Sequence, residues 1–143
     1  LNVGIGNKEG FEEFYHLTSN TLSSFSKDEV DRVIEIDNRQ KIERIDKIKV
    51  VTIQKIIDEH CKGVFPDFLN IDAEGVDEII IKSIDFEKTY PKVICIETAK
   101  YSTSGFPQKT TETTDFLKSK GYFIFSDNII NTVLVKENLS ANR

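Results

Sequence analysis

The sequence predicts an α/β protein with a mostly parallel sheet and an antiparallel strand at its C-terminal edge. From about residue 47 to residue 120, β-branched and apolar runs alternate with segments whose apolar residues repeat at helical spacing. That alternation is typical of parallel strands joined by crossover helices. Beyond Gly121, only a short Ser-Asp-Asn turn separates the last two apolar runs, which favours antiparallel pairing.

Composition indicates one globular domain over residues 1–143. Hydrophobic residues make up 38% of the chain and charged residues 30%, and this length allows a real core. The net charge of -5 comes from interleaved acids and bases, so we expect no nucleic-acid partner and no basic membrane patch. Because no apolar run approaches membrane-spanning length and the first residues do not form a signal peptide, we also expect no membrane partner.

The cysteines and histidines bear on compartment and metal binding. Cys61 and Cys95 lie far apart in apolar contexts, which favours free thiols over a disulfide and predicts a reducing, cytoplasmic location. His16 and His60 have no His or Cys neighbour at ligand spacing, so neither is read as a zinc ligand. The chain contains no methionine and begins at Leu1, so we expect it to be part of a longer protein.

The N-terminal third is harder to interpret. Residues 1–6 and 11–17 read as two strands around the turn Asn7–Gly10, which predicts a hairpin. Residues 18–26 form a Ser/Thr-rich loop that is either a solvated connection or a ligand contact. Residues 27–46 are densely charged with only a weak apolar pattern, which predicts irregular structure or an edge strand.

The rest of the chain gives clearer signals. Thr52 is expected to cap a helix, and Pro66 precedes the central strand without removing a ladder donor from it. Gly75 is expected in the turn before one helix, and Gly121 just past the end of another. The expected strands are 47–52, 68–71, 92–97, 122–125 and 131–135; the expected helices are about 53–60, 76 to 83 or 84, and 113–120; residues 101–111 form a loop and 139–143 a tail.

The central stretch is Phe68-Leu69-Asn70-Ile71-Asp72-Ala73-Glu74-Gly75. It reads as a strand, an acidic tip, a glycine turn and the start of a helix. Ligands of open α/β sheets bind just beyond the carboxyl ends of strands, and Glu97 ends the next strand as Asp72 ends this one. Crowded carboxylates are costly unless something binds or orients them. The alternative is structural: Asp72 caps the helix and Glu74 complements its dipole.

This octapeptide resembles the lysine-apolar-Asp-apolar-Glu-Gly signature of FkbM-type methyltransferases. Other segments resemble further parts of that family in the same order, and together they cover about residues 2–136. They are the hairpin Asn2–Tyr15 with Ser23-Ser24, the segment Val50–Ile57, the strand Tyr90–Glu97, and Gly121-Tyr122 followed by Asn131–Val135.

The resemblance implies a class I methyltransferase (Rossmann-like) fold, S-adenosylmethionine as cofactor, and O-methylation of a carbohydrate or other small-molecule substrate. By position, Asp72 would lie beside the methyl donor and the acceptor, as a cofactor-binding and catalytic residue. Asp72 or Glu74 would act as base or orienting group, and Glu97 would shape the substrate pocket. Positioning alone can also drive a methyl transfer. We expect no resident metal.

The sequence also departs from the family. Asn70 stands where the family commonly has lysine. The glycine turn after the family's first strand and the ribose-binding acid after its second have no counterpart here. The glycines of Gly4–Gly10 are not followed by a convincing helix, so we reject them as the cofactor loop. We therefore expect an incomplete copy that begins at the family's third strand.

An incomplete copy would leave one side of the central strand unpaired. The N-terminal hairpin could pair there, the chain could form a homodimer, or a longer chain could supply the partner. Two other functions stay open. One is a non-catalytic, methyltransferase-like binding module. The other is a Mg²⁺, Ca²⁺ or hydrolase site built from Asp72, Glu74 and Glu97.

Overall fold

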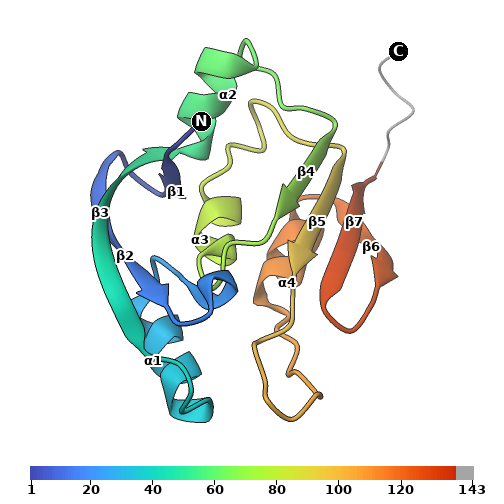
Figure 1. Ribbon diagram of the computed structural model, residues 1–143. Coiled ribbons are helices and arrows are strands. Elements are labelled where there is room, and N and C mark those ends of the chain that lie inside the picture. The colour runs from blue at the N-terminus through green and yellow to red at the C-terminus, as the bar shows by residue number, and fades with distance from the viewer. Residues whose placement is uncertain (138–143) are drawn as a thin grey trace.

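The computed structural model describes residues 1–137, so the tail predicted at residues 139–143 lies outside the described residues. The chain is a mixed α/β structure with two sheets (Figure 1). Its elements in order are β1 (Gly4–Gly6), β2 (Gly10–Leu17), the short helix η1 (Asn20–Leu22), α1 (Lys27–Ile36), β3 (Ile42–Thr52), α2 (Ile53–His60), β4 (Phe68–Ile71), α3 (Asp77–Lys82), β5 (Val93–Glu97), α4 (Glu112–Ser119), β6 (Tyr122–Asp127) and β7 (Asn131–Lys136).

The first sheet has the order β1-β3-β2. β3 lies parallel to β1 and antiparallel to β2, and its Val50 is opposite both Gly4 and Gly10. The predicted hairpin between β1 and β2 is therefore wrong. The reason is the length of β3: it begins at Ile42 instead of Lys47, and its 11 residues pair with a strand on each side.

The second sheet has the order β4-β5-β7-β6. β4 and β5 are parallel, whereas β7 runs antiparallel to both β5 and β6. The antiparallel C-terminal strand is thus confirmed, but the mostly parallel sheet is not. Of the five pairings between strands in residues 1–137, three are antiparallel, because β2 and β7 run against their neighbours.

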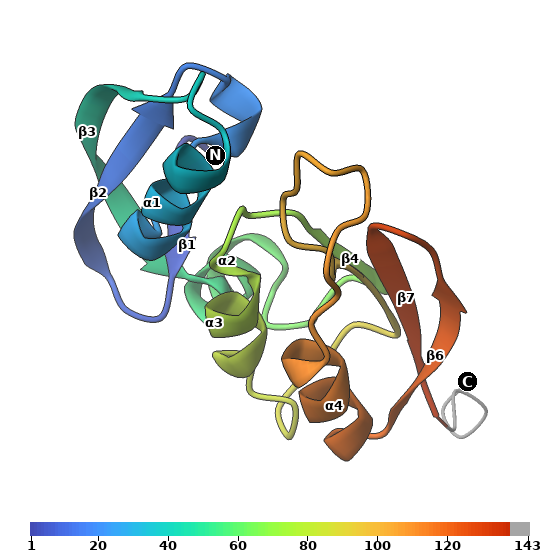
Figure 2. The ribbon, with the colours of Figure 1, turned by 90° about the horizontal axis from the view of Figure 1, so that it is seen from below.

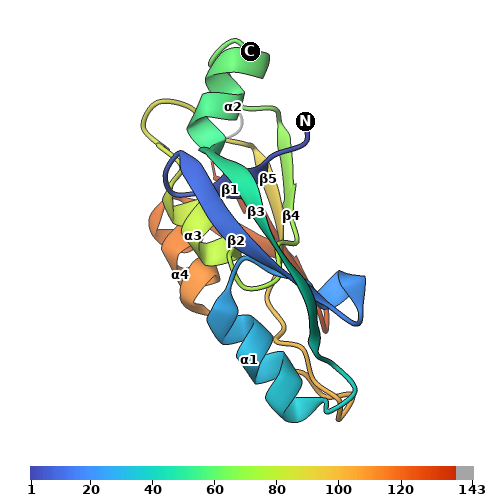
Figure 3. The ribbon, with the colours of Figure 1, turned by 60° about the vertical axis from the view of Figure 1, so that its left-hand side comes forward.

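Helices α3 and α4 lie on one side of the second sheet (Figures 2 and 3). The core on that side contains aromatic residues such as Tyr122 and a set of fully buried aliphatic ones: Ile81 of α3, Leu117 of α4, and Ile94, Ile96 and Leu134 of the sheet. This core holds the carboxyl ends of β4 and β5 side by side, since Ile71 is paired with Ile96.

β4 is an edge strand within the described part of the chain. It pairs with β5 alone, and Phe68 is 58% exposed. The N-terminal segment does not pair with it, because β1 pairs with β3. An apolar cavity of about 400 Å³ lies along this edge between β4 and residues of β1 and α2, among them Ile5 and Ile53.

The expectation of irregular structure or an edge strand over residues 27–46 is wrong, because residues 27–36 form helix α1 and residues 42–46 belong to the central strand β3. The Ser26 hydroxyl accepts a hydrogen bond from the backbone N–H of Glu29 (3.2 Å), which caps the helix. Val30 and Val33, one turn apart, are buried against Leu17 and the rest of a small second core. The apolar stripe is narrow because the remaining faces of α1 are charged.

Across residues 1–137, no helix combines the length and the apolar character needed to cross a lipid bilayer.

The predicted cap of α2 is confirmed, because the Thr52 hydroxyl accepts from the N–H of Lys55 at 3.2 Å. We predict that Thr52→Ala lowers the free energy of unfolding by about 1 kcal/mol and that Thr52→Ser restores most of it. Urea denaturation followed by circular dichroism measures both. Equal stability of Thr52→Ala and the wild type would contradict the capping role.

Candidate functional site

The turn from Asp72 to Gly75 connects β4 to α3. Glu74 and Gly75 have φ angles of 43° and 91°, so two successive residues adopt the left-handed region. For Glu74 this conformation is uncommon and costs energy that the surroundings must offset. The backbone N–H of Ala73 donates to Asp77 Oδ1 at 3.2 Å. Since the N-cap of α3 is Val76, the interpretation of Asp72 as its cap is wrong.

The turn is held from the first sheet and α1. The hydroxyl of Ser24, which is 1% exposed, donates to the backbone oxygen of Glu74. A Cβ on Gly75 would lie 2.9 Å from Cβ of Glu29 and 3.4 Å from Cβ of Ser26. Residue 75 therefore needs to be glycine for two reasons, its positive φ and its close contact with α1.

The structure brings the three predicted site residues together. One carboxylate oxygen from each of Asp72, Glu74 and Glu97 lies within 4.8 Å of the others. Asp72 and Glu74 come from the turn after β4, and Glu97 comes from the end of the parallel neighbour β5. Asp72 is exposed, whereas the other two are partly buried. This donor set would also suit a hard divalent cation.

Burial and mutual repulsion change the proton affinity of this cluster. Burial raises the pKa of Glu74 to about 7, and the charges of Glu97 and Asp72 add to the effect. Burial likewise raises the pKa of Glu97 to about 7, with the charges of Asp72 and Asp77 contributing. Two carboxyl groups are therefore poised to accept or release a proton near neutral pH.

Residues of this cluster line two cavities. The first, which we call the acidic pocket, has a volume of about 310 Å³, and its lining residues include six acids and one lysine. The second has about 370 Å³ and lies between β1 and the turn, with Asp72 on its wall. Glu74 lines both cavities. The acids of the acidic pocket are Glu29, Glu74, Asp77, Glu78, Glu97 and Glu112, and its polar wall includes Thr98, Lys100, Tyr101, Thr110 and Thr113.

Sequence reasoning missed the contribution of α1. Glu29 lines the acidic pocket, and Arg32 donates from Nε to Oε2 of Glu29 at 2.9 Å. The other branch of Arg32, through Nη1, donates to the backbone oxygen of Tyr101 at 3.0 Å. The spacing of Ser26 and Glu29, a capping box followed by apolar residues, was the signal that could have revealed this helix.

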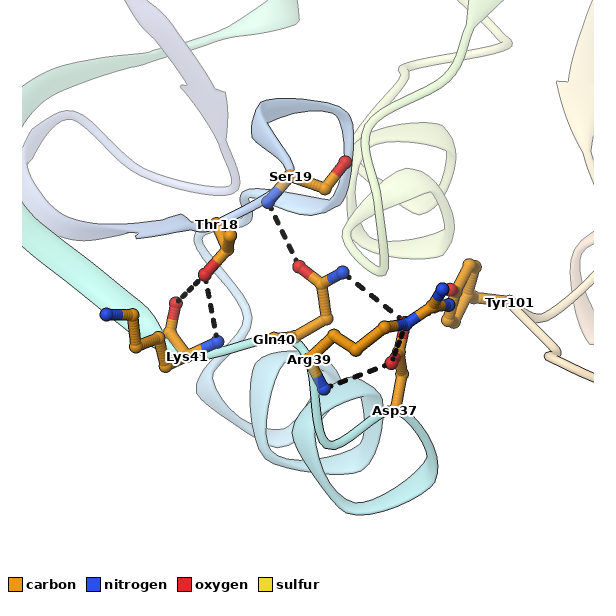
Figure 4. Close-up of polar contacts among 7 residues, drawn as sticks. All are labelled: Thr18, Ser19, Asp37, Arg39, Gln40, Lys41 and Tyr101. Atoms are coloured by element: carbon orange, nitrogen blue, oxygen red, sulfur yellow. Dashed lines mark hydrogen bonds and ion pairs between the residues drawn. The ribbon is translucent and has the colours of Figure 1, made fainter.

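Tyr101 is anchored a second time through its hydroxyl, which donates to Oδ2 of Asp37 at 3.1 Å (Figure 4). Asp37 is buried and also accepts from Nε of Arg39 at 2.8 Å and from the amide of Gln40 at 3.4 Å. The Arg39 guanidinium holds the pKa of Asp37 well below its usual range. Asp37 therefore remains an ionised acceptor for Tyr101 at any physiological pH.

Comparison with known proteins identifies a family. The model of the family described as "Methyltransferase FkbM domain" matches residues 1–124, a range that contains all three carboxylates, α1 and the loop of Tyr101. This is the family that the sequence motifs resemble. Neither the curated proteins nor the solved structures contain a match.

A glycine substitution tests the contact between α1 and the turn. We predict that Gly75→Ala destabilises the protein by roughly 2–3 kcal/mol, because it adds overlap with Glu29 to the cost of positive φ. Gly105→Ala is the matched control: its φ is +76° and nothing lies within 4 Å of the added methyl group. Equal losses for the two variants in urea denaturation would show that the close packing at Gly75 contributes nothing.

The raised pKa values predict how stability depends on pH. The folded forms of Glu74 and Glu97 bind protons more tightly than the unfolded chain, whose glutamates titrate near 4.5. Their contribution is therefore complete below pH 4.5 and is lost as the pH rises toward 7. We predict that Glu97→Gln weakens this pH dependence and, at pH 8, exceeds the wild type in stability by roughly 1 kcal/mol after allowance for solvent screening.

Urea denaturation between pH 4 and pH 8 measures this difference. Glu87→Gln, which changes an exposed acid away from the cluster, serves as the control. Parallel pH profiles for Glu97→Gln and the wild type would contradict the crowding of these carboxylates.

Proposed function

The chain belongs to the FkbM methyltransferase domain family, and on this premise we propose that it transfers a methyl group from S-adenosylmethionine to a hydroxyl group of a sugar or another small metabolite. The observation that supports this most strongly is the position of Glu74, which lines two adjoining cavities. A transfer reaction requires two ligands whose reacting atoms meet, and a proton-accepting group at the meeting point accelerates it.

The carboxylates take separate roles in this proposal. Glu74 is the base, because a carboxyl group whose pKa is near 7 accepts a proton from a hydroxyl better than an ordinary carboxylate does. Asp72, exposed beside it, orients the acceptor and faces the charged end of the donor. Glu97 shapes the acidic pocket and keeps the pKa of Glu74 high through its own charge.

The residues of this chain suit only part of S-adenosylmethionine. Asp72 lines both the 370 Å³ cavity and the apolar cavity along β4, and a carboxylate there suits a sulfonium cation. The glycines of Gly4–Gly10 do not form a cradle. β2 follows them instead of a helix, and a Cβ on Gly4 would lie 2.5 Å from the Phe25 ring. We therefore propose that this chain contacts only the charged end of the donor, through Asp72.

When bound, S-adenosylmethionine supplies an electrophilic methyl group. The chain's own residues do the remaining work. The polar wall of the acidic pocket, which includes Thr110 and Lys100, holds a polar acceptor. Glu74 takes the acceptor's hydroxyl proton as the new bond to oxygen forms, and its partial burial limits competition from water.

Methyl transfer from radiolabelled S-adenosylmethionine to a panel of sugars and hydroxylated metabolites tests the proposal. The assay is run on this chain and on the product of its gene expressed from the natural start. We predict that Glu74→Gln lowers kcat at least ~100-fold and that Asp72→Asn also lowers it, while the exposed control Glu87→Gln has no effect. Full turnover by Asp72→Asn would remove Asp72 from the mechanism.

Calorimetry with S-adenosylhomocysteine separates this proposal from a non-catalytic function. The proposal requires binding by at least one of the two forms of the protein. If neither form binds and neither transfers a methyl group, methyl transfer is excluded for them, which leaves the methyltransferase-like binding module and the carboxylate metal site.

A further inference from the structure

The walls of the acidic pocket come from distant parts of the chain. Glu29 on α1 forms one wall, and the loop that follows β5, with Tyr101, forms another. Figure 3 shows α1 beside this loop, and the hydrogen bond from Arg32 to Tyr101 spans 69 residues of sequence. One wall is on α1, between β2 and β3 of the first sheet, and the other is on the loop after β5 of the second sheet, so their separation depends on the contacts that cross between them.

Arg32 makes the central contact. Its Nε and one terminal nitrogen both donate to the carboxylate of Glu29, and its other terminal nitrogen donates to the backbone oxygen of Tyr101. The side chains of Arg32 and Glu29 are only 29% and 18% exposed. A bidentate ion pair with little access to water is stronger and more rigid than a surface ion pair.

We propose that Arg32 is a positioning residue: its guanidinium fastens Glu29 on α1 to Tyr101 on the opposite wall, and so sets the width of the acidic pocket. The hydrogen bonds given for its guanidinium go to those two residues and not to Asp72, Glu74 or Glu97, although its charge also interacts with that of Glu74. The inference deepens the proposed function by assigning what holds the acceptor pocket in shape.

The loop of residues 98–110 is closed by backbone hydrogen bonds and therefore moves as one unit with Tyr101. The N–H of Thr110 donates to the backbone oxygen of Thr98 at 2.8 Å, and the N–H of Lys100 donates to that of Gln108 at 2.9 Å. These bonds close the loop on itself next to β5. Fixing Tyr101 therefore fixes the whole wall, and the bond from the Tyr101 hydroxyl to Asp37 limits its rotation.

The fork of arginine is essential to the proposal. A lysine at position 32 keeps the positive charge and can pair with Glu29, but one ammonium cannot reproduce the fixed geometry that spans both walls. Arg32→Lys thus separates charge from positioning. Arg32→Gln removes both, and Arg44→Gln is the control because Arg44 is an exposed residue that pairs with Asp46 on the first sheet.

Hydrogen–deuterium exchange of the folded chain, read by mass spectrometry, tests the proposal without any ligand. We predict that the hydrogen-bonded loop amides of Lys100 and Thr110 exchange roughly tenfold faster in both Arg32→Lys and Arg32→Gln, as expected for the loss of a charged hydrogen bond. Amides of β5 and β7 keep their wild-type rates, and Arg44→Gln leaves the loop unchanged. Tyr101→Phe, which loses the hydroxyl anchor alone, gives a smaller increase.

Three results would overturn the proposal. Wild-type exchange of the loop in both Arg32 variants would show that Arg32 does not hold the wall. Wild-type exchange in Arg32→Lys alone would show that charge suffices. Uniformly faster exchange along the chain would reveal a general structural role. None of these exchange measurements needs S-adenosylmethionine, so their outcome is independent of the proposed function. With any acceptor that the enzyme methylates, we predict that Arg32→Lys raises KM more than it lowers kcat.

Discussion

The crowding of carboxylates at the end of β4 is the constraint on which the rest of the structure depends. Asp72, Glu74 and Glu97 lie within 4.8 Å of one another through one oxygen each. Like charges this close and partly removed from water cannot all be ionised without cost. The contacts of α1 and Ser24 with the turn, and the parallel pairing of β4 with β5, hold the carboxylates together despite this cost.

The two sheets have different tasks in this arrangement. The second sheet and its helices supply the carboxylates from the ends of adjacent parallel strands. The first sheet presents α1, which packs on Gly75 and contributes Glu29 to the acidic pocket. The site therefore lies between the parts of the chain that are built on the two sheets, and the hydrogen bond from Arg32 to Tyr101 connects these parts there. A pocket between units is also where ligand sites commonly form.

Sequence reasoning located the carboxylate cluster better than the architecture. The octapeptide around Asp72 and the acid that ends the next strand identified the cluster, because two adjacent parallel strands must end at the same edge. The N-terminal topology could not be read in the same way. β3 pairs with a strand on each side, and no local pattern tells a central strand from the second arm of a hairpin. Helix α1 was not recognised, because most of its residues are charged and only Val30 and Val33 are buried on it. Glu29 and Arg32, which lie on the same helix, were therefore missed as well.

The most direct test of this account is the titration of the cluster itself. NMR of a chain labelled at its glutamate and aspartate carboxyl carbons follows Glu74 and Glu97 through pH 3 to 9. The account predicts that both carboxyl groups titrate near pH 7 because of burial and neighbouring charges, and that replacing Glu97 by glutamine moves the midpoint of Glu74 down toward the ordinary glutamate value. Two independent titrations near pH 4.5, unaffected by the neighbouring substitution, would contradict it.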